Sequence, residues 1–290
     1  MSDFVITACS TSDLWEDYTK ERNIQLFPYS FIMSGKEYSD DFGQSMPIKT
    51  FYQRVRGGEM PSTSMINVQT YTDYFEPILA SGKDILHIEF SSGLSGSCSN
   101  AKNAAKELNG KYPNQIYVVD SLCASLGYGL LVHYALNLRD EGKSLEEIRT
   151  WLEENKLRLN HWFTVDDLNH LKRGGRVSGV TAFLGTMLSI KPVLNVDDDG
   201  HLIPREKARG RKKAIVELVN KMKERIVDPD GQMVFICQGD CIDDAEFLAA
   251  KIKETFPGVL DVKIGYTGPV IGAHSGPGTL AVFFMGDRRQ

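Results

Sequence analysis

The sequence predicts an α/β protein of two domains. The predicted N-terminal domain, residues 1–160, has a mainly parallel sheet with helices on both faces, and the C-terminal domain, residues 161–290, is α+β. In the first half, apolar segments rich in Val, Ile, Phe and Tyr alternate with helix-like segments, which is typical of parallel strands joined by crossover helices. After residue 161, Asp199-Gly200 gives a strong hairpin signal between two strand-like segments. We expect a ligand to bind between the two domains.

The predicted elements of the N-terminal domain follow from these segments. Strands are expected over residues 3–10, 24–33, 84–92 and 115–121, and helices over residues 48–58, 68–82, 103–111 and 144–155. Ser144 and Glu147 have the spacing of a capping box at the start of the last helix. Functional residues of such a domain should lie where strands end and helices begin.

The C-terminal domain mixes hairpins with helices. Strands are expected over residues 161–165, 192–196, 201–206, 233–240, 262–268 and 279–285, and helices over residues 211–226 and 243–256. A short helix is expected to end at Gly174-Gly175, because glycine is common just after a helix.

Composition excludes several classes of protein. The chain has 290 residues, of which 42% are hydrophobic and 24% charged, with a formal net charge of −5, so a general nucleic-acid binder is not expected. The N-terminus lacks the pattern of a signal peptide and no apolar run is long enough to span a membrane, so we expect a cytoplasmic protein without stable membrane insertion. The cysteines show no C-x-x-C pair or zinc-ligand set and are expected to be reduced and buried, without a metal. These are Cys9, Cys98, Cys123, Cys237 and Cys241.

Residues 87–101, HIEFSSGLSGSCSNA, place serines and glycines between a predicted strand and a helix. Three interpretations are open: a serine nucleophile, a phosphate or carboxylate cradle at the helix start, or a capped helix without a ligand. The nucleophile pattern G-x-S-x-G fails because Ser97 occupies its last position, and no Asp is placed to orient His274 as a base. The P-loop pattern and the dinucleotide fingerprint G-x-G-x-x-G are also absent.

Three further segments carry polar groups suited to an anion. Thr63 and Ser64 precede a predicted helix, where their hydroxyls could cap the helix or contact a ligand. Arg176 follows the double glycine, and His274 lies in a glycine-rich segment expected to be a loop. Together these groups favour an anionic head group. The apolar runs at 180–190 and 191–196 could line an adjoining hydrophobic cavity or belong to the ordinary core.

The motifs, taken in order, strongly resemble the DegV family over almost the whole chain. They are STSDL (10–14), STS (62–64), SSGLSGS (91–97), VVDSLCASLGYG (118–129), LKRGGRVSG (171–179), KPVLNVDDDGHLIPREKARGRKKAI (191–215) and GPVIGAHSGPGTLAVFF (268–284). The resemblance implies a two-domain protein that encloses one long-chain fatty acid. It also implies that the protein is the non-catalytic, acyl-carrying subunit of a bacterial fatty acid kinase, which presents the carboxylate to a separate kinase subunit and then holds the acyl phosphate. Neither a catalytic residue nor a cofactor is expected in this chain.

The resemblance also implies roles for particular residues. Thr63, Ser95 and His274 correspond to the residues that contact the carboxylate, with a backbone donor from Gly96 and Ser64 as a neighbour. Arg176 and Arg209 are implicated in the phosphorylation step or in kinase docking.

The chain departs from the family pattern in two places. Cys9 stands where an Asp is common, and Met65-Ile66 stand where Gln-Pro usually follows the Thr-Ser pair, so acyl preference or partner docking could differ. Two other functions stay open, a serine-dependent lipid hydrolase and a phosphate-sensing regulatory module.

Overall fold

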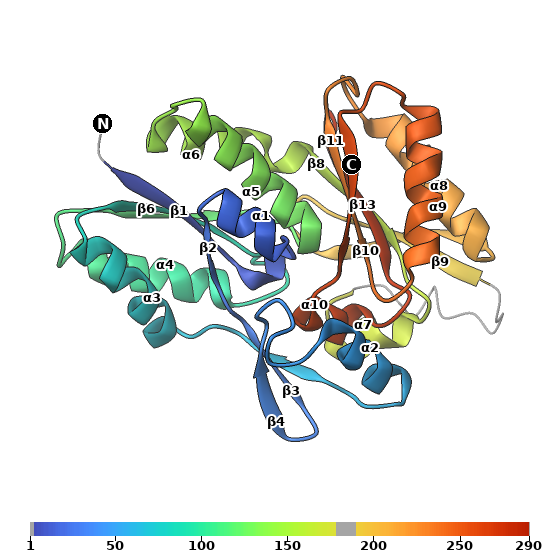
Figure 1. Ribbon diagram of the computed structural model, residues 1–290, viewed down its shortest axis with the longest axis horizontal. Helices are drawn as coiled ribbons and strands as arrows, with labels where there is room; N and C mark the ends of the chain where they lie inside the picture. The colour runs from blue at the N-terminus through green and yellow to red at the C-terminus, as the bar shows by residue number, and fades with distance from the viewer. Residues whose placement is uncertain (1–2, 178–189, 290) are drawn as a thin grey trace.

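The computed structural model describes residues 3–177 and 190–289 (Figure 1). Within these ranges the strands form a parallel sheet, a mixed sheet and a small antiparallel sheet. The parallel and mixed sheets lie side by side with their helices, and the small sheet lies below them in Figure 1. This arrangement confirms the predicted α/β class with a parallel sheet and a second α+β part.

The parallel sheet has the strand order β2-β1-β6-β7, and each pair of neighbours is parallel. Its strands are β1 (Phe4–Cys9), β2 (Gln25–Phe27), β6 (Asp84–Glu89) and β7 (Ile116–Asp120). Helices α3 (Val68–Ala80) and α4 (Ser97–Asn109) cover one face, while α5 (Ser125–Asp140) and α6 (Leu145–Asn155) cover the other, and α1 (Glu16–Glu21) follows β1 (Figure 1). Because helices cover both faces, β6 is buried at every position after its first. The Ser144–Glu147 capping box is confirmed at the start of α6.

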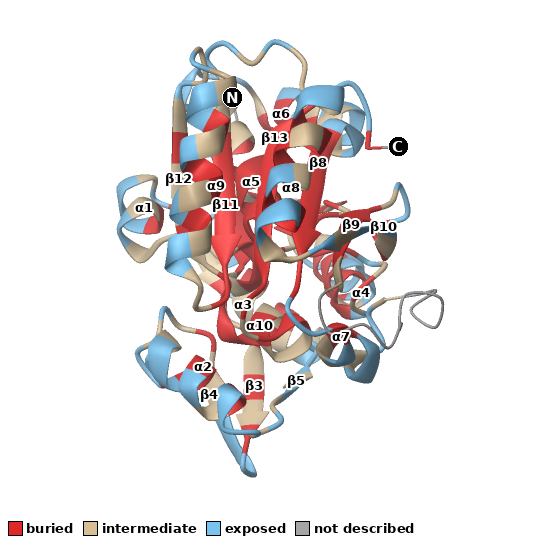
Figure 2. Ribbon diagram, turned by 90° about the vertical axis from the view of Figure 1, so that its right-hand side faces the viewer, coloured by how far each residue is buried: buried red, intermediate tan, exposed pale blue. Residues whose placement is uncertain are grey.

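The mixed sheet has the order β10-β9-β8-β13-β11-β12, in which β11 and β12 are parallel and the other pairs antiparallel. Its strands are β8 (Leu159–Thr164), β9 (Ile190–Val196), β10 (Leu202–Arg209), β11 (Met233–Gln238), β12 (Asp261–Tyr266) and β13 (Leu280–Met285). The predicted hairpin is confirmed, since β9 and β10 pair across a turn in which Gly200 has a φ of 79°. Helices α8 (Arg211–Arg225) and α9 (Ile242–Thr255) cover one face of buried strands (Figure 2).

Helix α5 packs between the parallel sheet and the mixed sheet, where it contacts β1, β8, β11 and β13. It is buried without a break from Ser125 to Val132. A helical segment that is buried on all sides has no polar face and therefore no clear amphipathic period, which explains why no helix was predicted here.

The small sheet was not predicted. Its order is β4-β3-β5, with β3 (Ser30–Met33), β4 (Lys36–Ser39) and β5 (Ser62–Ser64), and α2 (Ile48–Arg56) follows β4 in the chain. The strand expected over residues 24–33 is divided, because β2 and β3 belong to different sheets. The capping interpretation of residues 62–64 is wrong: these residues form β5, and Asn67 caps α3 by accepting a hydrogen bond from the Thr70 N–H.

Short helices complete the described fold. They are η1 (Ser10–Ser12), η2 (Lys156–Arg158), α7 (Leu168–Gly174) and α10 (Pro269–Ser275). The predicted end of α7 is confirmed, since Gly175 is a left-handed cap with a φ of 67°. Among the described residues, no helix is both long and apolar enough to cross a bilayer. The apolar run at 180–190 lies outside the described residues except for Ile190, and the domain division at residue 160, which falls within β8, stays a prediction.

Candidate ligand-binding site

A cavity of about 590 Å³ lies where the parallel sheet, the mixed sheet and the small sheet meet. Its walls are mostly apolar, with a few polar side chains, as is usual for small-molecule sites. The apolar lining includes Phe90, Leu94, Phe163, Leu171, Val196, Leu202, Val270 and Phe283. Residues from both sides of the predicted domain division therefore contribute to one cavity.

The serine-rich loop, residues 91–96, connects β6 to α4 and brings Ser95 and Gly96 to the cavity wall. The Ser95 N–H donates to the carbonyl of Ser91, and the Ser97 N–H donates to Ser95 Oγ at 3.2 Å. Ser95 Oγ donates in turn to Ser97 Oγ at 3.0 Å. The first backbone N–H groups of α4 thus lie beside the cavity, where an anion can meet both these donors and the helix dipole.

The two glycines of the loop have different surroundings. An ideal Cβ at Gly93 would lie 2.5 Å from the carbonyl oxygen of Asp199 and 2.9 Å from that of Gly200, both backbone atoms of the β9–β10 hairpin. An ideal Cβ at Gly96 would meet only Met65 Sδ, at 3.0 Å. Gly93 therefore allows the hairpin to pack closely against the loop, whereas Gly96 lines the cavity.

Thr63 and His274 meet across the cavity wall, although they are 211 residues apart in the chain. Thr63 Oγ1 and His274 Nε2 are hydrogen-bonded at 2.8 Å. His274 lies on α10 and not in a loop, which corrects the expectation from the glycine-rich segment. The glycine that permits close approach to the imidazole is Gly174 of α7, because a Cβ there would collide with His274 Nδ1.

Burial and, to a smaller extent, the nearby positive charge of Arg176 together lower the pKa of His274 to about 4. Its imidazole is therefore neutral near pH 7, with one donor and one acceptor nitrogen. Arg176 itself is exposed at the cavity, where its Nε donates to the Leu94 carbonyl at 3.2 Å and its Nη1 donates to the carbonyl of Gly174. A permanent positive charge thus lies between the serine-rich loop and the end of α7.

The structure brings most of the predicted site residues together. Thr63, Ser64, Ser95, Gly96, Arg176 and His274 all line the cavity. Arg209 is not among the described residues that line it; it is exposed at the end of β10, opposite Ile190. Among the described residues, Ser95 and His274 are not hydrogen-bonded to each other, because Ser95 pairs with Ser97 and His274 with Thr63. The geometry does not assemble the nucleophile and base that a serine hydrolase needs.

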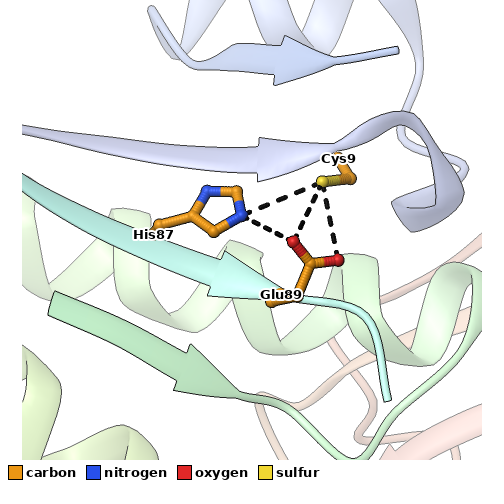
Figure 3. Close-up of side chains that lie close together, drawn as sticks. All are labelled: Cys9, His87 and Glu89. Carbon is orange, nitrogen blue, oxygen red and sulfur yellow. Dashed lines mark hydrogen bonds and ion pairs between the residues drawn. The ribbon is translucent and has the colours of Figure 1, made fainter. Parts of the chain in front are cut away.

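A buried polar cluster behind the serine-rich loop was not predicted from the sequence. Cys9 at the end of β1 and His87 and Glu89 on β6 are all fully buried (Figure 3). Glu89 Oε2 lies 2.7 Å from His87 Nε2 and 3.4 Å from Cys9 Sγ. The i, i+2 spacing of His87 and Glu89 in a strand predicted to be buried was the one signal that could have indicated it.

These three residue types can bind zinc, but their atoms already serve one another as hydrogen-bond partners (Figure 3). Burial raises the pKa of Cys9 well above its usual value, so its sulfur is a thiol and not the thiolate that a metal requires. The cluster is therefore a hydrogen-bond network.

A second set of side chains that could bind a metal, Asp197, Asp199 and His201, lies in the β9–β10 hairpin turn. Asp197 Oδ1 accepts hydrogen bonds from the backbone N–H groups of Asp199 and His201.

Comparisons with known proteins agree with the motifs. A family model described as "Uncharacterised protein, DegV family" matches residues 3–287. The DegV domain-containing protein CPE0026 of Clostridium perfringens is 45% identical over 100% of both chains. A fatty-acid-binding DegV family protein from Thermus thermophilus has a solved structure that covers 99% of this chain and 100% of its own, with a TM-score of 0.88 and 30% identity. DegV of Bacillus subtilis, a fatty acid binding protein, has the same coverage with a TM-score of 0.84 and 28% identity. This chain therefore belongs to the DegV family.

Proposed function

We propose that this protein is the fatty-acid-binding subunit of a fatty acid kinase. It encloses one long-chain fatty acid in the cavity and presents the carboxylate to a separate kinase subunit, which converts it to the acyl phosphate. In this proposal the chain supplies binding and orientation, with no catalytic residue, metal or cofactor of its own. The comparison structures from Thermus thermophilus and Bacillus subtilis, both of fatty-acid-binding proteins, support the first part of the proposal.

The observation that carries the proposal is the grouping of polar donors at one part of an apolar cavity. The hydroxyls of Thr63 and Ser95, the imidazole of His274 and the start of α4 at Gly96 line the same cavity as many apolar side chains. A carboxylate accepts several such hydrogen bonds, while its alkyl chain gains free energy by leaving water for the apolar walls. Exposed Ser64 lies beside Thr63 on β5 as a further donor.

The two arginines fit different parts of this function. Arg176 lines the cavity and is exposed, so its guanidinium can reach both the carboxylate and a phosphoryl group approaching from outside. Arg209 is exposed on β10 away from the cavity lining, which fits contact with the kinase subunit better than contact with the acyl chain. The five cysteines of this chain, all within the described residues, are unpaired, which supports a cytoplasmic location for the protein.

Native mass spectrometry of the purified protein, followed by solvent extraction, tests the binding step. We expect a co-purified fatty acid, and Ser95→Ala should weaken its binding by about tenfold to a hundredfold, because a hydrogen bond to a charged group contributes roughly 1.5–3 kcal/mol. Ser92→Ala is the matched control, since Ser92 is exposed in the same loop and is not among the described cavity residues. Equal loss in both variants would contradict the assignment of Ser95.

The same preparations separate the alternatives. Adding the cognate kinase subunit and ATP should produce the acyl phosphate. A protein without bound hydrocarbon that retains inorganic phosphate would instead be a phosphate sensor. Cleavage of a fatty acyl ester by the wild type that disappears in His274→Ala would show a hydrolase.

A further inference from the structure

Two buried threonines of the cavity lining have no part in the proposed carboxylate site. Thr11 lies in η1 and Thr267 directly follows β12; both are fully buried, and both line the cavity. Neither Oγ1 atom has a hydrogen-bond partner among the described residues. Buried hydroxyls are normally hydrogen-bonded, because the loss of water is costly without a replacement. Since no described protein atom supplies that replacement, the cavity is the place from which a ligand could.

Hydrogen bonds to Asp13 connect the two threonines. Asp13 lies two residues after Thr11, and its Oδ1 accepts from the Gly268 N–H at 3.0 Å, directly after Thr267. Its Oδ2 accepts from the hydroxyl of Ser125, the first residue of α5, which also lines the cavity. Ser125 Oγ has thus given its proton to Asp13 and can still accept one. Thr11, Ser125 and Thr267 form a second polar cluster in the cavity wall.

Helix α10 gives the distance between this second polar cluster and the carboxylate site. Thr267 precedes the Gly268 cap of α10, His274 lies near its end, and Val270 and Ile271 between them line the cavity. Thr267 and His274 are seven positions apart in the chain, which corresponds to about 10 Å along a helix. An extended chain advances by about 1.2 Å per bond, so this distance corresponds to roughly eight bonds of an acyl chain. The threonines therefore lie near the middle of a long-chain fatty acid whose carboxylate is at His274.

The charges in the lining select a neutral partner for the second polar cluster. Among the described lining residues, Arg176 is the only one with a permanent positive charge, and it bonds to the Leu94 carbonyl of the serine-rich loop. The second polar cluster instead has the carboxyl group of Asp13 behind it, so it does not suit a second anion. Threonine hydroxyls both donate and accept, and the Ser125 oxygen accepts. A hydroxyl group on the acyl chain satisfies all of these atoms.

We propose that the cavity selects fatty acids that carry a hydroxyl group near the middle of the chain. The carboxylate binds at the start of α4, and the chain hydroxyl bonds with Thr11, Thr267 and Ser125. An unsubstituted chain leaves the two threonine hydroxyls without partners, which is the physical basis of the selection. The inference rests on the proposed function and deepens it by naming the ligand class.

Three lipids of equal chain length test the position of the hydroxyl group. The affinities of the delipidated protein for stearate, 10-hydroxystearate and 2-hydroxystearate are measured by isothermal titration calorimetry. The wild type should bind 10-hydroxystearate about threefold to tenfold more tightly than stearate, because one or more neutral hydrogen bonds are gained. An apolar wall would instead disfavour the buried hydroxyl by about tenfold or more. The hydroxyl of 2-hydroxystearate lies beside the carboxylate and reports on the first site alone.

Three valine variants show which hydroxyls cause the preference. Thr11→Val and Thr267→Val should each reduce the preference for 10-hydroxystearate by about threefold to tenfold, without lowering the affinity for stearate or changing the ratio of 2-hydroxystearate to stearate. Thr164→Val is the matched control, because Thr164 is also buried with an unpartnered hydroxyl but is not among the described lining residues. Thr164→Val should leave all three affinities unchanged.

The wild-type comparison stands without any variant. A wild type that binds stearate as tightly as 10-hydroxystearate, or more tightly, would overturn the inference. So would a preference that persists in both Thr11→Val and Thr267→Val, or one that Thr164→Val reduces equally. A wild type that binds none of the three lipids would contradict the proposed function itself.

Discussion

Gly93→Ala tests the close packing of the serine-rich loop against the β9–β10 hairpin. The new Cβ would lie 2.5 Å from the Asp199 carbonyl oxygen, against an ordinary contact of about 3.4–3.5 Å, so the loop or the hairpin must retreat by about 1 Å. Both are held by the bond from Ser91 Oγ to the Gly200 carbonyl at 2.9 Å. Overpacking of this kind costs about 1–3 kcal/mol. At roughly 2–4 °C per kcal/mol, the melting temperature should fall by several degrees.

Thermal unfolding and fatty acid affinity should be measured together. Displacement of the loop also displaces Leu94 and Ser95, so Gly93→Ala should weaken binding by roughly tenfold as well as lower the melting temperature. Gly96→Ala is the matched control for stability, because its Cβ would meet only the flexible end of Met65. Wild-type stability and affinity in Gly93→Ala would refute the packing of the loop against the hairpin.

The other predictions concern the groups around the cavity. Gly96→Val should keep the fold and weaken fatty acid binding, because its larger side chain blocks the start of α4; isothermal titration calorimetry checks this, and unchanged affinity would place the carboxylate elsewhere. The His274 pKa is about 4 in the folded protein and 6.5 in the reference state, so the unfolded chain binds more protons between these values and the free energy of unfolding falls as pH falls through this window. His274→Gln should therefore show a shallower pH dependence in denaturant titrations at pH 4–6.5, and identical slopes would contradict the burial of a neutral imidazole. Arg209→Ala should retain bound fatty acid but slow acyl phosphate formation by the kinase subunit, whereas loss of the bound lipid would assign Arg209 to the cavity.

Local sequence patterns predicted most of the elements. The alternation of apolar strands and helices indicated the parallel sheet, and Asp199-Gly200 marked the β9–β10 hairpin. These predictions succeeded because both signals are local. The periodicity of apolar residues and the backbone conformation of turn residues depend only on a few neighbouring positions in the sequence. The same reasoning failed for α5 and for β5: the first half of α5 is buried on all sides and has no polar face, and a three-residue strand is too short to show a period.

The polar residues of the site were found by the type of side chain, but their arrangement came from the tertiary structure. An anion site in the serine-rich segment was predicted because a strand–helix junction leaves N–H groups free, and the family resemblance singled out Ser95 and Gly96. The hydrogen bond between Thr63 and His274 joins the small sheet to a helix near the end of the chain, and no local pattern determines such a contact. Arg176 and Arg209 were predicted to share a role, but of the two only Arg176 is among the described residues that line the cavity.

The sequence by itself determined most of the strands and helices, the position of the hairpin turn, and which hydroxyl, arginine and histidine side chains could form a polar site. Only the tertiary structure decided that Gly93 faces a hairpin, that His274 is buried and neutral, and that Glu89 is buried in contact with His87 and Cys9. The physical reason is that element type depends on neighbours within a few residues. Burial, hydrogen-bond direction and charge state depend instead on groups that folding brings together from distant parts of the chain.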